Sequence, residues 1–228
     1  MSLYKMENVP RYFITWTIYV ALFLGVIAAV FPFVWMLLVS FMTRGEALRK
    51  VFTPADLQWG NYLHAWREED FALYFENSLL IALLQVVGTL LFSLLSAYAL
   101  ARMNFRGREL IFYGILATLM VPETVTMVPN FLTVSWLHKT GPVAWINNWP
   151  SLTVPFMGSA FSIFLLRQFM RGIPSELWDA ARIDGSGHLR FLFMIVLPLC
   201  RAPLLTVGMF TLIGSWNALG WPLLVTNN

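Results

Sequence analysis

Charged residues are scarce in this sequence. Only 12% of its 228 residues are Asp, Glu, Lys or Arg, whereas 58% are hydrophobic. Soluble domains usually carry about 25% charged residues, because a surface that faces water needs them. The apolar residues also form long blocks rather than isolated core positions. This composition excludes an ordinary soluble domain and favours a chain that lies in a membrane.

The sequence also lacks the residues that several kinds of function require. Its single cysteine, Cys200, excludes an internal disulfide and a thiolate metal site, so no metal is expected. The Lys and Arg residues form no run that could follow a nucleic-acid backbone. No phosphate-binding loop of the GxxxxGK[ST] type is present, so the chain cannot hydrolyse ATP by itself. We therefore expect no catalytic residue and no cofactor bound by this chain.

Five apolar blocks are long enough to cross a bilayer as helices, which requires about 20 residues. They are continuous rather than alternating, which excludes barrel strands and predicts an all-α integral membrane bundle. The first block contains 32 residues without a charge from Tyr12 to Thr43, too long for the apolar region of a signal peptide, which is about 7–15 residues. The predicted spans are Tyr12–Phe41, Ser78–Ala101, Leu110–Leu137, Trp149–Leu166 and Ala202–Leu224.

The basic residues predict the orientation, because cytoplasmic loops carry an excess of Lys and Arg. With the N-terminus in the cytoplasm, ten basic residues fall inside and five outside. The inner ones are Lys5, Arg11, Arg102, Arg106, Arg108, Arg167, Arg171, Arg182, Arg190 and Arg201, and the outer ones are Arg44, Arg49, Lys50, Arg67 and Lys139. We therefore expect a cytoplasmic N-terminus.

The cytoplasmic segment between the fourth and fifth spans, residues 171–190, predicts a short projecting helix. Pro174 suits a first helical turn, or Ser175 caps the helix, and acidic residues favour its positive end. Gly185 can end it in a left-handed conformation. Two alanines leave no side-chain bulk, so another surface could approach the backbone. The residues that we expect to contact a partner are Glu176, Asp179, Ala180, Ala181, Asp184 and Gly185. A solvated helix at the lipid headgroups is the alternative.

This segment resembles the "EAA" loop of bacterial ATP-binding cassette (ABC) importer permeases. The family pattern is Glu-Ala-Ala, then Asp-Gly-Ala, then Ile-x-Leu-Pro. Here it reads Asp179-Ala180-Ala181, Asp184-Gly185-Ser186 and Ile195-Val196-Leu197-Pro198, with Asp in place of Glu and Ser in place of Ala. Further matches to carbohydrate-type permeases are Asn61-Tyr62, Asn77-Ser78, Ala97 to Arg102, Phe164 to Phe169 and Trp216-Asn217.

Together these segments resemble the smaller second permease of the maltose and glycerol-3-phosphate type. The resemblance implies one transmembrane domain over residues 1–228, with six core spans, so a final span would be missing here. It implies import of a sugar or sugar derivative across the bacterial inner membrane by alternating access. The implied partners are ABC ATPase subunits that use ATP and Mg²⁺, a second and different permease, and an extracytoplasmic sugar-binding protein. The projecting helix would dock on the ATPase.

Glu123 is the only charged residue in the third apolar block, where a carboxylate is costly unless it is hydrated or paired. Pro122 precedes it and Pro129 follows, so residues 121–130 predict a broken segment that lines the substrate pathway, with Glu123 and Asn130 as candidate contacts. A position near the outer water interface is an equal alternative for Glu123.

Trp216, Asn217 and Trp221 form a second candidate group, because sugars stack on aromatic rings and hydrogen-bond to amides. Interfacial belt positions are as well supported for the two tryptophans.

Two other classes of function fit the residues less well. An intramembrane enzyme needs convergent catalytic groups within the spans, and no histidine falls within a predicted span. A proton-coupled secondary carrier could use Glu123 as its relay, but the coupling-loop pattern favours the ATP-driven importer.

Overall fold

The computed structural model describes residues 11–49, 56–68 and 70–226. Secondary structure within these ranges is helical, without β-strands. The chain divides into two units, Met1–Ala72 and Leu73–Asn228. Lys5 and Lys50, which contributed to the predicted orientation, and the chain end at Asn228 lie outside the described residues.

The first unit contains α1 (Arg11–Ser40), α2 (Arg44–Leu48) and α3 (Gly60–Glu68). α1 confirms the first predicted helix, and none of its most apolar window is buried by the rest of the chain. The last carbonyls of a helix need partners from outside it. The Asn61 side-chain amide donates to the Ser40 and Met42 carbonyls, both at 3.0 Å, so the first turn of α3 supplies donors to the end of α1 and to the residues just after it.

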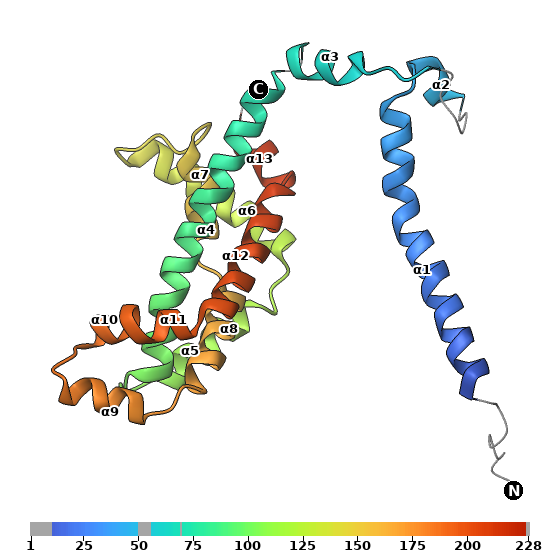
Figure 1. The fold of residues 1–228 in the computed structure, drawn as a ribbon. Coiled ribbons are helices and arrows are strands. Elements are labelled where there is room, and N and C mark those ends of the chain that lie inside the picture. Colours follow the sequence, from blue (N-terminus) through green and yellow to red (C-terminus); the bar gives the residue numbers. More distant parts are fainter. Residues whose placement is uncertain (1–10, 50–55, 69, 227–228) are drawn as a thin grey trace, which may run out of the picture. The chain divides into compact units, whose positions relative to one another are not determined.

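The second unit starts within one long helix, α4 (Phe71–Arg102), and continues through shorter ones (Figure 1). These are α5 (Arg108–Thr118), α6 (Glu123–Thr140), α7 (Trp149–Thr153), the 3₁₀ turn η1 (Val154–Phe156), α8 (Ala160–Arg171), α9 (Glu176–Ile183), α10 (His188–Phe191), the π-helical turn η2 (Leu192–Val196), α11 (Leu197–Leu199), α12 (Arg201–Trp216) and α13 (Gly220–Val225).

Two helices, Ile14–Ser40 within α1 and Phe71–Arg102, are long and apolar enough to cross a membrane alone. Three further candidates are pairs of helices that meet at a bend. α5 and α6 meet at 102°, α7–η1 and α8 at 42°, and the helices on either side of Cys200 at 81°. If each bent pair is one span, the described residues supply up to five. The predicted blocks therefore fall on these helices.

Three predicted blocks are not continuous helices. The break in the third block, between α5 and α6, falls in the segment predicted to be broken, but the breaks in the fourth and fifth blocks were not predicted. The predicted fourth span, Trp149–Leu166, is interrupted between η1 and α8, where Ser159 caps the new helix by accepting from the Ser162 amide. The predicted fifth span, Ala202–Leu224, is interrupted after Trp216, and α13 begins at Gly220. Hydropathy alone did not detect these breaks because the interrupting residues carry no charge and are flanked by apolar residues.

The largest buried cluster lies at the end of the second unit that holds α9 and α10 (lower in Figure 1). It joins α4, α8, α9, α10, η2 and α12. Its fully buried members include Ala97, Leu166, Met170, Leu192 and Val207. A separate, smaller cluster joins α6, α7 and α13 around Val134, Leu152, Trp221 and Val225. The second unit therefore has one apolar core toward each end.

Arg167 was counted above among the basic residues that favour the cytoplasmic side, but it is only 1% exposed. Its guanidinium donates to both oxygens of Glu109, at 2.7 and 2.8 Å, and through Nε to the Leu100 carbonyl at 3.1 Å. The same group lies 3.7 Å from the centre of the Phe112 ring. A buried charge persists only when it is paired in this way, so Arg167 joins α4, α5 and α8.

Close packing of α4 against the break before α8 yields the first prediction. Gly88 leaves no room for a side chain, since a Cβ built there would overlap the Met157 side chain. Gly114 on α5 has open space around it. We expect Gly88→Val to lower the free energy of unfolding by about 1–3 kcal/mol, the usual cost of overpacking. Thermal unfolding in detergent measures the loss of stability, with Gly114→Val as the control. Equal losses of stability in the two variants would contradict close packing at Gly88.

Candidate functional site

A cavity of about 950 Å³ lies within the second unit. Its walls come from α4, the start of α6, the segment before α7, α7 and η1, the start of α8, the end of α12, and α13. The lining side chains are aromatic rings, amides, hydroxyls, aliphatic groups and one carboxylate. Those used below are Asn77, Ser78, Gln85, Thr89, Glu123, Thr124, Leu152, Phe156, Ser162, Phe210, Thr211, Trp216, Asn217 and Trp221.

Glu123 lines this cavity because the chain breaks directly before it. α5 ends at Thr118, and Pro122 is extended (φ −60°, ψ 137°) at the N-cap of α6. A proline is tolerated there, since the first helical amides have no partner within the helix. The predicted break at Pro122 is thus present, whereas Pro129 lies inside α6 without interrupting it. Glu123 is exposed at the positive end of α6.

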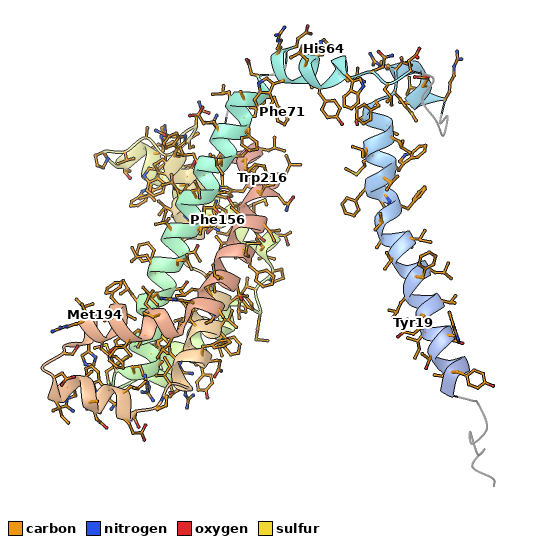
Figure 2. The ribbon with its side chains drawn as sticks, viewed as in Figure 1. Tyr19, His64, Phe71, Phe156, Met194 and Trp216 are labelled. Carbon is orange, nitrogen blue, oxygen red and sulfur yellow. The ribbon has the colours of Figure 1, made fainter. Side chains whose placement is uncertain are left out.

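Trp216 ends α12 (labelled in Figure 2) and Asn217 follows it as the C-cap. Both residues line the cavity. Trp216 is 45% exposed, and its ring meets Phe75 of α4 edge-on at 5.4 Å. One face of its indole can therefore take an apolar ligand surface. The Asn217 amide nitrogen donates to the Ile213 carbonyl at 2.8 Å, which leaves its side-chain oxygen as the group that can accept from a ligand.

Trp221 also lines the cavity, but its polar atom is occupied. Pro155 has no N–H, so Ser151 lacks the donor that a continuous helix would supply four residues later. The Trp221 indole N–H donates to that Ser151 carbonyl at 2.8 Å, and the side chain is only 6% exposed. Sequence reasoning missed this role, although Pro155 four residues after Ser151 is the signal that could have shown it.

α4 supplies the other donors that the break requires. The Gln85 side chain donates to the Leu152 carbonyl at 2.7 Å, and the Thr89 hydroxyl donates to the Phe156 carbonyl at 3.2 Å. Both side chains are buried in a largely apolar stretch of α4. Irregular backbone at membrane depth is stable only where side chains or water satisfy it. The cavity wall is therefore held by hydrogen bonds between elements more than 60 residues apart in sequence.

Asn130 is exposed on α6 and is not among the lining residues. The structure therefore brings four of the five predicted pathway residues, Glu123, Trp216, Asn217 and Trp221, to one cavity and separates the fifth from them. Neutral polar residues of α4 that the prediction did not include, such as Asn77 and Ser78, face the same space.

The predicted projecting helix is α9, at the other end of the unit. Ser175 occupies its N-cap position without a side-chain capping bond, and Glu176 and Asp179 lie in the first turn. Gly185 has φ +71°. The Gly185 amide donates to Arg182 at 3.0 Å and the Ser186 amide donates to Ala181 at 2.8 Å. This pair of bonds is a Schellman motif, which requires a left-handed residue at the position of Gly185.

The two alanines of α9 face different surroundings. Ala180 is exposed beside Asp179, whereas Ala181 is 6% exposed and belongs to the core of the unit. Only Ala180 can therefore offer a small surface to another chain, and Ala181 brings α9 close to its own core. Ile183 is 87% exposed and extends the free face with an apolar side chain.

Ring stacking and side-chain hydrogen bonds connect α9 and the residues just before it to the rest of the unit. Trp178 stacks on His188 with ring centres 4.4 Å apart, and the Tyr98 hydroxyl is 2.9 Å from His188 Nδ1. At the entry to α9, the Arg102 guanidinium donates to the carbonyls of Ile173 and Pro174 at 2.8 and 3.2 Å. Motion of α9 would therefore pull directly on the end of α4.

Residues 89–228, which include α9 and most of the cavity lining, match the family model described as the binding-protein-dependent transport system inner membrane component. The chain belongs to this family. It is the membrane-spanning permease component of an ABC importer, and hydrolysis of ATP belongs to a separate subunit. The predicted family, the helical membrane fold and the non-catalytic character of the chain are thereby confirmed.

Individual relatives support the same assignment. The sn-glycerol-3-phosphate transport system permease protein UgpE of Yersinia enterocolitica is 35% identical over 222 residues, covering 92% of this chain and 75% of the relative. The diacetylchitobiose uptake system permease protein NgcG of Streptomyces coelicolor is 34% identical over 86% of this chain and 64% of the relative. The arabinooligosaccharides transport system permease protein AraQ of Halalkalibacterium halodurans is 34% identical over 86% of this chain and 70% of the relative.

A solved structure has the same fold. It is a chain from a bacterial ABC transporter involved in the import of the acidic polysaccharide alginate. It matches 98% of this chain and 78% of its own length, with a TM-score of 0.84 and 25% sequence identity.

The occupied indole N–H of Trp221 yields the second prediction. We expect Trp221→Phe to lower the free energy of unfolding by about 1–3 kcal/mol, because the buried Ser151 carbonyl loses its donor. Thermal unfolding of the purified protein measures the effect. Trp136→Phe, at a position 62% exposed on α6, is the matched control. If both substitutions lower stability equally, Trp221 does not support the break in this way.

Proposed function

We propose that this permease imports a sugar or sugar derivative, and that the cavity forms part of its pathway. The observation that carries the proposal is the chemistry of the lining. Trp216 offers an aromatic face, Asn77 and Asn217 offer amides, and Ser78, Thr124 and Thr211 offer hydroxyls. Sugars are recognised by this combination of stacking and uncharged hydrogen bonds. The names of the diacetylchitobiose and arabinooligosaccharide relatives support a carbohydrate cargo.

The proposed complex also contains ABC ATPase subunits, a second and different permease, and an extracytoplasmic sugar-binding protein. The ATPase uses ATP and Mg²⁺, and this chain binds no cofactor. The N-terminus and residues 171–190 lie on the cytoplasmic side, and α9 docks on the ATPase. Alternating access then opens the pathway to one side of the bacterial inner membrane at a time. The Arg102 bonds to the start of α9 support transmission of ATPase motion to α4.

Uptake by the native host tests the proposed function. Depletion of sugars from the medium should require this chain, stop when cellular ATP is exhausted, and persist when a protonophore removes the proton gradient. Depletion that ends with the proton gradient while ATP remains high would contradict the importer and favour a carrier that uses Glu123.

The Trp216 face predicts a specific loss of uptake. Stacking on an aromatic ring is worth about 1 kcal/mol, which corresponds to roughly fivefold in affinity. We expect Trp216→Ala to raise the half-saturating sugar concentration for chain-dependent uptake by roughly that factor. Trp136→Ala, which removes an exposed tryptophan outside the cavity lining, should leave it unchanged. Equal values for the two variants would remove Trp216 from the pathway.

The end of α9 predicts a loss of partner binding. An alanine at Gly185 must adopt a left-handed conformation, which costs about 1–2 kcal/mol. We therefore expect Gly185→Ala to reduce the amount of ATPase subunit recovered with the tagged chain by roughly fivefold or more. Asp179→Lys, which reverses the exposed charge, should act in the same direction.

Gly187 supplies the matched control, because its φ is −84° and a Cβ there meets open space. Recovery of the ATPase should be unchanged in Gly187→Ala. Equal recovery with Gly185→Ala and Gly187→Ala would show that the shape of α9 does not determine docking.

A further inference from the structure

The cavity carries charge of only one sign. Among the residues that line it, Glu123 is acidic and none is Lys, Arg or His. All other polar groups of the lining are amides, hydroxyls, indole N–H groups or backbone atoms, which can hydrogen-bond to neutral hydroxyls as they do to water. An anionic ligand would thus meet one carboxylate and no cation.

Basic residues elsewhere on the lining helices do not reach this space. On α4, Arg102 follows the lining residue Thr89 by 13 positions, about 20 Å along the helix, and it binds the start of α9. On α6, His138 and Lys139 follow the lining residue Met127 by 11 and 12 positions, about 17 and 18 Å. On α12, Arg201 precedes Phe210 by nine positions, about 14 Å.

α8 is the remaining lining helix that bears arginines. Arg167 lies only five positions beyond the lining residue Ser162, but its guanidinium is bound to Glu109 and to the Leu100 carbonyl. Arg171 lies one further turn away, at the end of the helix. α7 and α13 contain no basic residue.

The helix ends that face the cavity are also not available to an anion. The positive end of α6 already carries the Glu123 carboxylate. At the start of α8, the Ser162 amide donates to the Ser159 hydroxyl, a capping bond within the chain. α13 also begins at the cavity, at Gly220, without a side-chain cap, but it is a helix of only six residues. The described wall thus has no arginine fork, a usual protein device for holding phosphate or carboxylate, and no free N-terminus of a longer helix.

We propose that this cavity admits uncharged saccharides and discriminates against anionic ones such as sugar phosphates and uronic-acid oligomers. The inference rests on the proposed function, since it specifies the cargo of that same pathway. The charge of the proposed cargo differs from that of the cargo named for the sn-glycerol-3-phosphate relative and for the alginate importer. It agrees with the uncharged cargo named for the diacetylchitobiose and arabinooligosaccharide relatives.

Chain-dependent depletion of a mixed polysaccharide hydrolysate tests this in the native host. An anion exchanger divides the hydrolysate into neutral and acidic fractions, and each fraction is fed to the parent strain and to a strain that lacks this chain. We expect chain-dependent depletion of neutral compounds to exceed that of acidic ones by at least about tenfold, since like charges in contact are strongly unfavourable. Chain-dependent depletion of acidic compounds, alone or equally with neutral ones, would overturn the inference and leave the proposed function standing. Depletion of neither would instead overturn the proposed function.

The role of Glu123 is tested with acidic competitors. Galacturonic-acid dimers should inhibit chain-dependent neutral uptake weakly in the parent protein and several-fold more strongly in Glu123→Gln, where the repelling charge is removed. Glu68→Gln neutralises an exposed acid outside the cavity and should retain the weak inhibition of the parent. Identical inhibition in the two variants, or strong inhibition of the parent protein, would contradict discrimination by the lining charge.

Discussion

The need to satisfy every backbone polar group away from water is the constraint on which this structure depends. A bilayer offers no solvent donors, so a broken helix survives only where side chains replace the missing bonds. In the second unit, the break around Pro155 frees carbonyls of α7 and η1. Gln85, Thr89 and Trp221 supply donors to three of them. The same three bonds fix the relative positions of α4, α7–η1 and α13, which form much of the cavity wall. The break at Pro155 therefore opens space for the cavity while these three carbonyls keep hydrogen-bond donors.

At the end of the unit that contains α9, charged side chains supply the hydrogen-bond donors to backbone carbonyls. Arg167 and Arg102 each bind a backbone carbonyl of another element, and Arg167 also pairs with Glu109. α4 participates at both ends, since it lines the cavity through Gln85 and Thr89 and contacts the entry of α9 through Arg102. A displacement of α9 can therefore reach the cavity through one continuous helix. This physical connection is what a permease driven by a separate ATPase requires.

Much of this could be predicted from the sequence where the signal is local. Long uncharged blocks predicted the helices, Pro122 predicted the break before Glu123, and Gly185 predicted the left-handed end of α9. Properties that depend on distant partners could not be predicted. Arg167 has the sequence appearance of a surface base, and only its packing against residues of α4 and α5 shows that it is buried. Ala180 and Ala181 are equivalent as a motif, and only the fold shows that the second faces inward. Asn130 shares its proline-flanked segment with Glu123 but lies apart from the cavity.

The most direct test of the central claim is thiol cross-linking between α9 and the ATPase subunit. Cys200, the single natural cysteine, is buried and can be replaced by alanine to give a background without thiols. In that background, Ala180→Cys should form an adduct with the ATPase in the native membrane, because position 180 is exposed on the face of α9 proposed to dock there. Ala181→Cys, one residue away and packed in the core, should not. Two results would contradict docking of the ATPase on the exposed face of α9. One is an equal yield of adduct at positions 180 and 181, and the other is no adduct at position 180 in membranes that contain the assembled complex.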